Sequence, residues 1–189
     1  MNAHKLLFLN VIFVVTGAGC ASLAPFPEQP ADFQLRGKLG VVEGSESFSA
    51  RFLWRQQGPG FTIDLWGPLG QGRVRLTGDE RRLAVVDGKG AILTEGNHAD
   101  VMHAHLGWSL PLAVLPDWVL GAPGASRASR HPQYDAAGHL VAFEQLDWAV
   151  AYGNHREVAG ANGARWLPRT ITARKGDYRV RLVISEWQI

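Results

Sequence analysis

Residues 33–66 read FQLRGKLGVVEGSESFSARFLWRQQGPGFTIDLW, and large apolar side chains recur at every second position through much of this stretch. The alternating positions are Phe33, Leu35, Leu39 and Val41, then Phe48, Ala50, Phe52 and Trp54, then Phe61, Ile63 and Leu65. Successive side chains of a strand point to opposite faces of its sheet, so this alternation gathers the apolar residues on one face. The stretch therefore predicts antiparallel strands with one buried face and one face in water.

The same pattern continues along the chain, with turn sequences between the runs. Turns that contain glycine or proline fall at 58–60, 67–68, 78–79 and 87–88, the last an Asp-Gly pair typical of hairpins. Further alternating runs cover 74–76, 140–146, 148–152, 166–173 and 178–187. A chain of 189 residues that is 46% hydrophobic has the size of one domain with its own core. We predict a mainly β protein of ten or eleven antiparallel strands, with one domain over 33–189.

Helical signals interrupt this pattern only in the middle of the chain. Asn97 is placed to cap a helix that runs through residue 106, with Asp100 in its first turn and Gly107 as its C-terminal glycine. A shorter helical stretch over 112–119 has its apolar residues on one face. Pro116 lies inside it and cannot donate a helical hydrogen bond. Either Pro116 falls in the first turn of one helix, or the stretch forms two separate short turns.

The first twenty residues resemble a bacterial lipoprotein signal. Lys5 precedes an apolar run over 6–15, and the small residues 17–19 precede Cys20, which is the one cysteine of the chain. The run is too short to cross a bilayer, which needs about 20 residues, but it fits the core of a secretory signal peptide. We expect residues 1–19 to be a signal peptide that is removed. An ordinary signal peptide with an incidental cysteine is the alternative.

Acylation of Cys20 would anchor the mature chain in a membrane, because several acyl chains hold a protein where a single chain does not. Residues 20–32 would then be the acylated cysteine and a short tether that contains three prolines. Ala21 follows the cysteine in place of Asp. In the bacterial sorting scheme that this segment resembles, the lack of Asp implies export to the outer membrane.

Motifs for catalysis and for cofactor binding are missing from the sequence. It has no Gly-x-Ser-x-Gly elbow, and its close glycine pairs are not followed by the Lys-Ser/Thr of a phosphate-binding loop. His103 and His105 are two positions apart on a predicted helix, so they face different directions and cannot form a metal pair. The carboxylates on predicted strands that have no evident partner are Asp64, Glu144 and Asp147. We therefore expect no catalytic residue, no metal and no cofactor, and a protein that is not an enzyme.

The charges of the chain nearly balance. Nineteen Lys and Arg against 17 Asp and Glu give a net charge of +2. This excess is too small for the concentrated basic patch of a nucleic-acid-binding protein, so no nucleic-acid partner is expected. Arg73, Arg75, Arg179 and Arg181 stand on the polar faces of predicted strands. Two interpretations of them stay open: a solvated face, or a surface that steers an acidic protein or lipid headgroups.

The landmarks of the mature chain together resemble one protein family. They are Leu35-Arg36-Gly37-Lys38-Leu39, Phe52-x-Trp54, Gly67-Pro68-Leu69-Gly70, Gly107 with Leu110-Pro111-Leu112, Leu115, Trp118 and Gly121, then Gln145, Trp148, Tyr152, Leu167-Pro168 and Trp187. In this order, on a chain with a lipoprotein signal, they resemble the LolB family. Members of that family are outer-membrane lipoproteins that receive other lipoproteins from the soluble periplasmic carrier LolA.

This resemblance implies a fold and a function that composition alone would not have shown. The implied fold is an unclosed, curved antiparallel β-barrel in which helices cover a hydrophobic cavity for acyl chains. The implied function is to take lipoproteins from LolA and insert them into the outer membrane, from a lipid-anchored position that faces the periplasm. We expect a monomer whose partners are LolA, the acyl chains of its cargo and outer-membrane lipids. A structural or sensory lipoprotein with the same fold is the alternative.

The residues that would line such a cavity belong to the alternating pattern and to the second helical stretch. The candidates are Leu35, Phe52, Trp54, Ile63, Leu65, Leu112, Leu115 and Trp118. A packed core uses the same residue types, so plain core packing stays open for each of them. The pattern by itself would have favoured a packed core.

The turn at Trp66, Gly67, Pro68, Leu69 and Gly70 places an apolar side chain where a polar one is usual. Proline suits the second position of a type I turn and glycine the fourth, which puts Leu69 at the tip of a hairpin between strands that end at Leu65 and begin at Gly72. Leu69 either folds back onto the protein or contacts something outside it. The family resemblance implies the second, a projecting loop that enters the membrane. The neighbouring Trp66 would then be an interfacial anchor.

Overall fold

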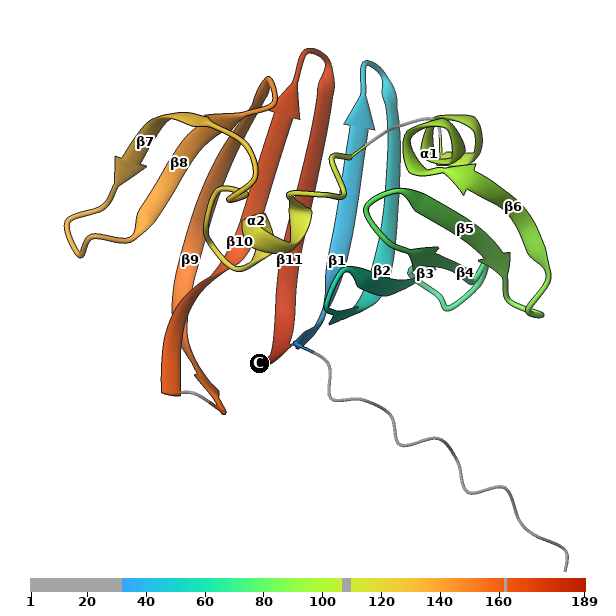
Figure 1. Ribbon diagram of the computed structural model, residues 1–189, viewed down its shortest axis with the longest axis horizontal. Coiled ribbons are helices and arrows are strands. Elements are labelled where there is room, and N and C mark those ends of the chain that lie inside the picture. Colours follow the sequence, from blue (N-terminus) through green and yellow to red (C-terminus); the bar gives the residue numbers. More distant parts are fainter. Residues whose placement is uncertain (1–31, 107–109, 162) are drawn as a thin grey trace, which may run out of the picture.

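The computed structural model describes residues 32–106, 110–161 and 163–189 (Figure 1). The signal peptide, Cys20 and nearly all of the tether lie outside the described residues, as does Gly107. Eleven strands form one antiparallel sheet in the order β6-β5-β4-β3-β2-β1-β11-β10-β9-β8-β7. Neighbouring strands in this sheet are also consecutive in sequence, except for β1 and β11, which are the first and the last strand. The sheet therefore consists of two series of hairpins, β1–β6 and β7–β11, that meet where β1 pairs with β11.

The strands are β1 (Phe33–Glu43), β2 (Glu46–Gln57), β3 (Gly60–Trp66), β4 (Val74–Gly78), β5 (Arg82–Asp87), β6 (Ile92–Asn97), β7 (Ser129–Tyr134), β8 (Leu140–Gln145), β9 (Trp148–Gly160), β10 (Gly163–Lys175) and β11 (Tyr178–Gln188). The helices are α1 (His98–Leu106) and α2 (Leu115–Val119). The sheet curves around these helices, and β6 and β7 are its two free edges (Figure 1). The predicted mainly β fold, with about eleven strands that do not close into a barrel, is confirmed.

A glycine allows the central strands β1, β2 and β11 to approach closely. A Cβ added to Gly37 of β1 would collide with the carbonyl of Val183 on β11, and it would lie 3.0 Å from a ring carbon of Phe52 on β2. The β1–β11 register shifts at this point, between Arg36 and Gly37, and Ser185 is the extra residue of β11. The Ser185 hydroxyl donates to the Arg36 carbonyl at 3.1 Å. Only glycine fits this bulge without displacing the neighbouring strand.

Both predicted helices form. The side-chain oxygen of Asn97 accepts a hydrogen bond from the Ala99 N–H at 3.0 Å, as predicted for the cap of α1. In α2, Pro116 falls in the first turn, where no helical hydrogen bond is required of its nitrogen. The first of the two alternatives for this stretch is therefore correct, and it forms one short helix.

A buried glutamine fastens α2 and the segment after it to the sheet. The Gln145 side-chain oxygen, on β8, accepts from Trp118 Nε1 and from the Gly124 N–H, both at 2.8 Å. The Gln145 side-chain nitrogen donates to the carbonyls of Gly124 at 2.9 Å and of Arg127 at 2.7 Å. Trp118 has no exposed surface and Gln145 is 2% exposed. These hydrogen bonds hold α2 against the inner face of the sheet, so α2 acts as a fixed cover.

Candidate functional site

A partly enclosed apolar cavity of about 40 Å³ lies between the inner face of the sheet and the helices. Its wall consists of Leu39, Phe52, Trp54, Ile63, Leu65, Leu76, Met102, Leu110, Leu112, Leu115 and Leu182. The strand residues come from β1–β4 and β11, Met102 comes from α1, and the others belong to α2 or to the segment before it. The wall has no charged side chain, and the indole N–H of Trp54 is already donated to the Gln56 side-chain oxygen at 3.0 Å. The cavity therefore suits a hydrocarbon ligand.

Most of the residues predicted to line a cavity do so. The wall contains Phe52, Trp54, Ile63, Leu65, Leu112 and Leu115. Leu35 and Trp118 are buried in the core without lining the cavity. The cavity is also lined by Leu39, Leu76 and Leu182, which were not among the predicted lining residues although they occupy the same alternating apolar positions. Met102 had no such signal, because only the fold brings α1 to the cavity.

The apolar cavity adjoins a much wider opening. Leu110 lines the cavity and also an open depression of about 840 Å³. The turns that join β1 to β2, β8 to β9 and β10 to β11 surround this depression, together with His98 at the start of α1. Its lining mixes charged side chains such as Glu43 and Lys175 with the apolar Leu146 and Trp148. A hydrogen bond to Glu43 raises the pKa of Tyr178. We call this opening the mouth; Leu110 is the residue that it shares with the apolar cavity.

The loop between β3 and β4 holds its apolar side chain in solvent. The Gly70 N–H donates to the Gly67 carbonyl, and the Gly67 N–H donates to the Gln71 carbonyl, both at 2.8 Å. Leu69 is 92% exposed, so its side chain does not fold back onto the protein. Trp66 is only partly exposed and ends β3. The next strand begins at Val74, two residues later than predicted, which lengthens the projecting loop.

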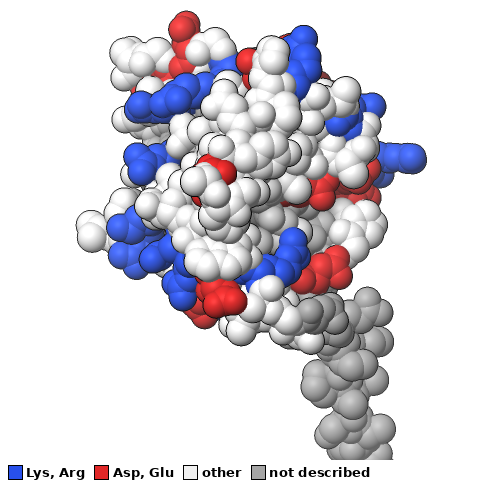
Figure 2. Space-filling view, turned by 90° about the vertical axis from the view of Figure 1, so that its left-hand side faces the viewer, with Lys and Arg blue, Asp and Glu red and all other residues white. Residues whose placement is uncertain are grey.

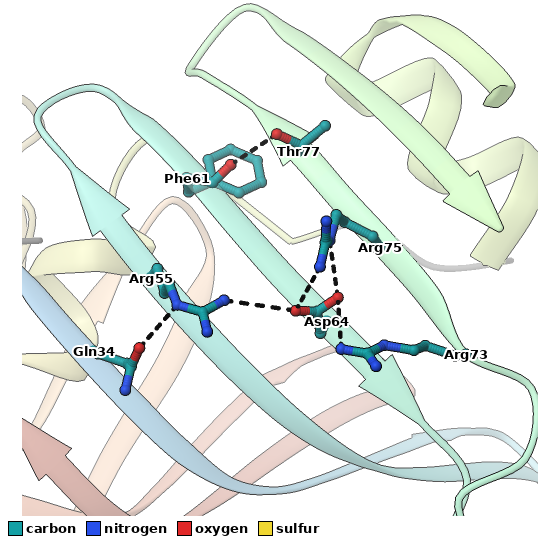
Figure 3. Close-up of polar contacts among 7 residues, drawn as sticks. All are labelled: Gln34, Arg55, Phe61, Asp64, Arg73, Arg75 and Thr77. Carbon is teal, nitrogen blue, oxygen red and sulfur yellow. Dashed lines mark hydrogen bonds and ion pairs between the residues drawn. The ribbon is translucent and has the colours of Figure 1, made fainter. Parts of the chain in front are cut away.

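A carboxylate on the outer face of the sheet collects three arginines near this loop (Figure 3). Asp64 lies between Ile63 and Leu65, which line the cavity, so its side chain points to the opposite face. Arg75 donates to both carboxylate oxygens of Asp64, at 2.9 and 3.3 Å. Arg73 lies 3.5 Å and Arg55 3.7 Å from Asp64 oxygens. Asp64 is 1% exposed, whereas each arginine side chain is about half exposed.

The expectation that three strand carboxylates lack partners is therefore wrong. Asp64 forms ion pairs with the three arginines. Glu144 lies 3.3 Å from a ring nitrogen of His131, and Asp147 lies 3.7 Å from the Lys175 ammonium. Each partner comes from a neighbouring strand or turn, which the linear sequence does not place side by side. The hydrogen bond to Asp64, together with its charge, raises the pKa of Arg75.

A second cluster lies on β9 and β10 and in the turn before β8. The rings of His139 and His155 stack at 5.3 Å, and Trp166 lies 5.1 Å from His139. Desolvation, together with the charge of His139, lowers the pKa of His155, while Asp135 partly opposes this shift. Among the described residues no three His, Cys, Asp or Glu side chains gather to hold a metal ion. The side chains of His103 and His105 are not among those described.

Neither helix of the described chain is long and apolar enough to cross a membrane.

Comparison with known proteins gives a consistent family assignment. The family profile "Outer membrane lipoprotein LolB" matches residues 31–187. The chain is 32% identical to the outer-membrane lipoprotein LolB of Chromohalobacter salexigens, over 99% of this chain and 92% of that protein. It is 36% identical to the LolB of Pseudomonas aeruginosa, over 82% of this chain and 74% of that protein.

A solved structure supports the fold. A LolA superfamily protein from Nitrosomonas europaea superimposes with a TM-score of 0.55 at 10% identity, covering 83% of this chain and 85% of that one. At this identity the likeness concerns the fold alone. The profile and the sequence relatives carry the family assignment, since they span nearly the whole described domain. This chain belongs to the LolB family of outer-membrane lipoproteins.

Proposed function

We propose that this protein takes lipoproteins from the periplasmic carrier LolA, holds their acyl chains in the apolar cavity and inserts them into the outer membrane. The observation that carries the proposal is the wholly apolar cavity that adjoins an open mouth. Acyl chains are bound through burial and shape, and each buried methylene contributes about 0.8 kcal/mol. No covalent bond is made or broken in such a transfer, so the proposed function requires no catalytic residue.

Cargo binding requires the cavity to enlarge. Its volume of about 40 Å³ is far below the roughly 300–1,000 Å³ of pockets that enclose small ligands. The Gln145 hydrogen bonds hold α2 in place. We therefore assign the movement to α1, whose Met102 fills one side of the cavity, and to the segment that carries Leu110 and Leu112. Displacing these side chains would join the cavity to the mouth.

The exposed loop supplies the contact with the acceptor membrane. Burying one leucine contributes about 1.5–3 kcal/mol, which is too little to anchor the protein but enough to orient it. Leu69 is available for this role because its side chain is 92% exposed. The acylated Cys20 would keep the domain at the membrane, so the loop only has to direct it.

A two-step transfer assay tests the proposal. Radiolabelled lipoprotein is passed from loaded LolA to this protein, and then from this protein to liposomes. Leu69→Glu should accept cargo normally and fail to release it into liposomes. Ile92→Glu is the matched control: Ile92 is 63% exposed on the edge strand β6, and the same charge there should leave both steps intact.

Two outcomes would count against the proposal. If the unaltered protein takes no cargo from loaded LolA, or binds it without passing it on, a structural or sensory lipoprotein becomes the better description. If Leu69→Glu impairs acceptance as strongly as release, or lowers the melting temperature, the loop does not act as a membrane contact.

A further inference from the structure

The outer face of the sheet beside the exposed loop is rich in unneutralised positive charge. We define the basic band as Lys38 on β1, Arg51 and Arg55 on β2, Arg73 in the loop and Arg75 on β4. Alternation puts all the strand members on the face opposite to the cavity. Figure 2 views the molecule from the side of β7 and β8, away from the band, and there Lys and Arg side chains lie among Asp and Glu side chains. The net charge of +2 for the whole chain therefore conceals an uneven distribution.

The carboxylate within the band cannot neutralise it. Asp64 carries one negative charge against three guanidinium groups, and only Arg75 makes close, two-pronged contact with it. Arg73 and Arg55 lie farther from Asp64, and their side chains are 56% and 42% exposed. A guanidinium has five N–H donors in a fork that matches carboxylate and phosphate oxygens. Arg55 also donates its Nε to the Gln34 side chain at 2.9 Å (Figure 3), and both arginines still expose about half of their side chains.

Two members of the band also face each other in a way that costs stability. Lys38 and Arg51 are directly paired across β1 and β2, and both are exposed. Like charges in directly opposed positions destabilise a sheet. An anionic surface laid against this face would relieve that repulsion. Arg51 is also paired with Trp66, the residue that leads into the loop, so the band is continuous with the projecting loop.

We propose that the basic band is a docking surface for the headgroups of anionic phospholipids, and that it presses the Leu69 loop onto the membrane. The proposal rests on the loop having the membrane role given to it above, and it adds the lipid class that the loop prefers. A lipid surface fits better than an acidic protein because the band adjoins the exposed Leu69 and the partly exposed Trp66. Cations beside apolar and aromatic side chains match the layered chemistry of a bilayer surface.

The test measures insertion of the loop directly. A fluorophore is attached to the full-length acylated protein at Gln71→Cys, beside Leu69 in the loop. The protein is reconstituted in vesicles of phosphatidylethanolamine and phosphatidylcholine, with or without phosphatidylglycerol. Quenching by brominated lipids then reports how much of the loop is inserted. The test variant is Arg51→Gln with Arg73→Gln.

The matched control is Arg174→Gln with Arg179→Gln. These arginines are also directly paired across two strands on the outer face, but they lie at the β10–β11 turn, away from the loop. Both variants remove two positive charges. Each cation close to an anionic surface raises partitioning about fivefold, so the test variant should reduce the inserted fraction in anionic vesicles at least tenfold. The control should stay near the unaltered protein, and about 1 M salt should abolish the preference for anionic lipid.

Every other outcome of these measurements would contradict a different claim. Equal quenching in neutral and anionic vesicles would mean that the loop inserts but the band does not recognise anionic lipid. An equal loss in the control variant would mean that only total charge matters, which also rejects the band. No quenching in either vesicle would refute the membrane role of the loop, and the band with it. Slower uptake of cargo from LolA by the test variant, with unchanged quenching, would assign the band to the carrier.

Discussion

Replacing Gln145 with methionine should loosen the fixed cover of the cavity. Methionine preserves the length of the side chain but cannot donate, and its sulfur is only a weak acceptor. Trp118 Nε1 and the Gly124 N–H would then lose their common acceptor. The carbonyls of Gly124 and Arg127 would lose their donor as well. Trp118 is fully buried, so water cannot replace the missing partner without opening the core.

The expected cost follows from the two orphaned donors. A buried polar group that loses its partner costs about 1–3 kcal/mol. Counting only the two donors, we expect Gln145→Met to lower the free energy of unfolding by about 3–4 kcal/mol. For a domain of this size each kcal/mol shifts the melting temperature by about 2–4 °C, so a fall of roughly 6–16 °C should follow.

Urea unfolding followed by circular dichroism measures this cost. Gln133→Met is the control, because Gln133 is exposed on the edge strand β7 and the same change there should cost under about 0.5 kcal/mol. A double-mutant cycle with Trp118→Phe isolates the hydrogen bond between the two side chains, with an expected coupling of about 1–2 kcal/mol. A cost below about 1 kcal/mol for Gln145→Met, or zero coupling, would show that Gln145 does not hold α2 in place.

Three further predictions concern single positions. Gly37→Ala should destabilise the sheet by about 1–3 kcal/mol because its Cβ meets the carbonyl of β11, whereas Gly40→Ala, with open space around its Cβ, should be nearly neutral in the same urea assay. Burial and the charge of His139 lower the pKa of His155, so the unfolded chain binds the proton more readily; stability should be full above about pH 6.5 and fall as the pH drops through the folded-state pKa. His155→Gln should flatten that dependence below about pH 6.5 in thermal unfolding, and an unchanged slope would contradict the assignment. Cys20→Ser should abolish incorporation of a palmitate analogue and tight membrane association, and equal labelling of the variant would rule out Cys20 as the acylated residue.

Sequence reasoning located much of the candidate site and missed specific parts of it for identifiable reasons. Alternation identified Phe52, Ile63 and Leu65, because a strand residue on the apolar face must point toward whatever that face encloses. It could not exclude Trp118, which lies beside the cavity and is fully buried in the core. It also could not find Met102, since the packing of α1 against the sheet is a contact between segments distant in sequence.

The strands, their turns, the single sheet and the family could be inferred from the linear sequence, because side-chain periodicity and turn residues act locally. Which carboxylate meets which cation depends on the folded sheet. Asp64 sits beside Arg55, Arg73 and Arg75 because three strands come into register, and register depends on pairing across the sheet. The cavity and its small volume are likewise tertiary properties, since an apolar side chain can fill a core or line a space with the same periodicity. The exposure of Leu69 is a tertiary property as well. The backbone hydrogen bonds within its loop hold the side chain in solvent, although it is hydrophobic.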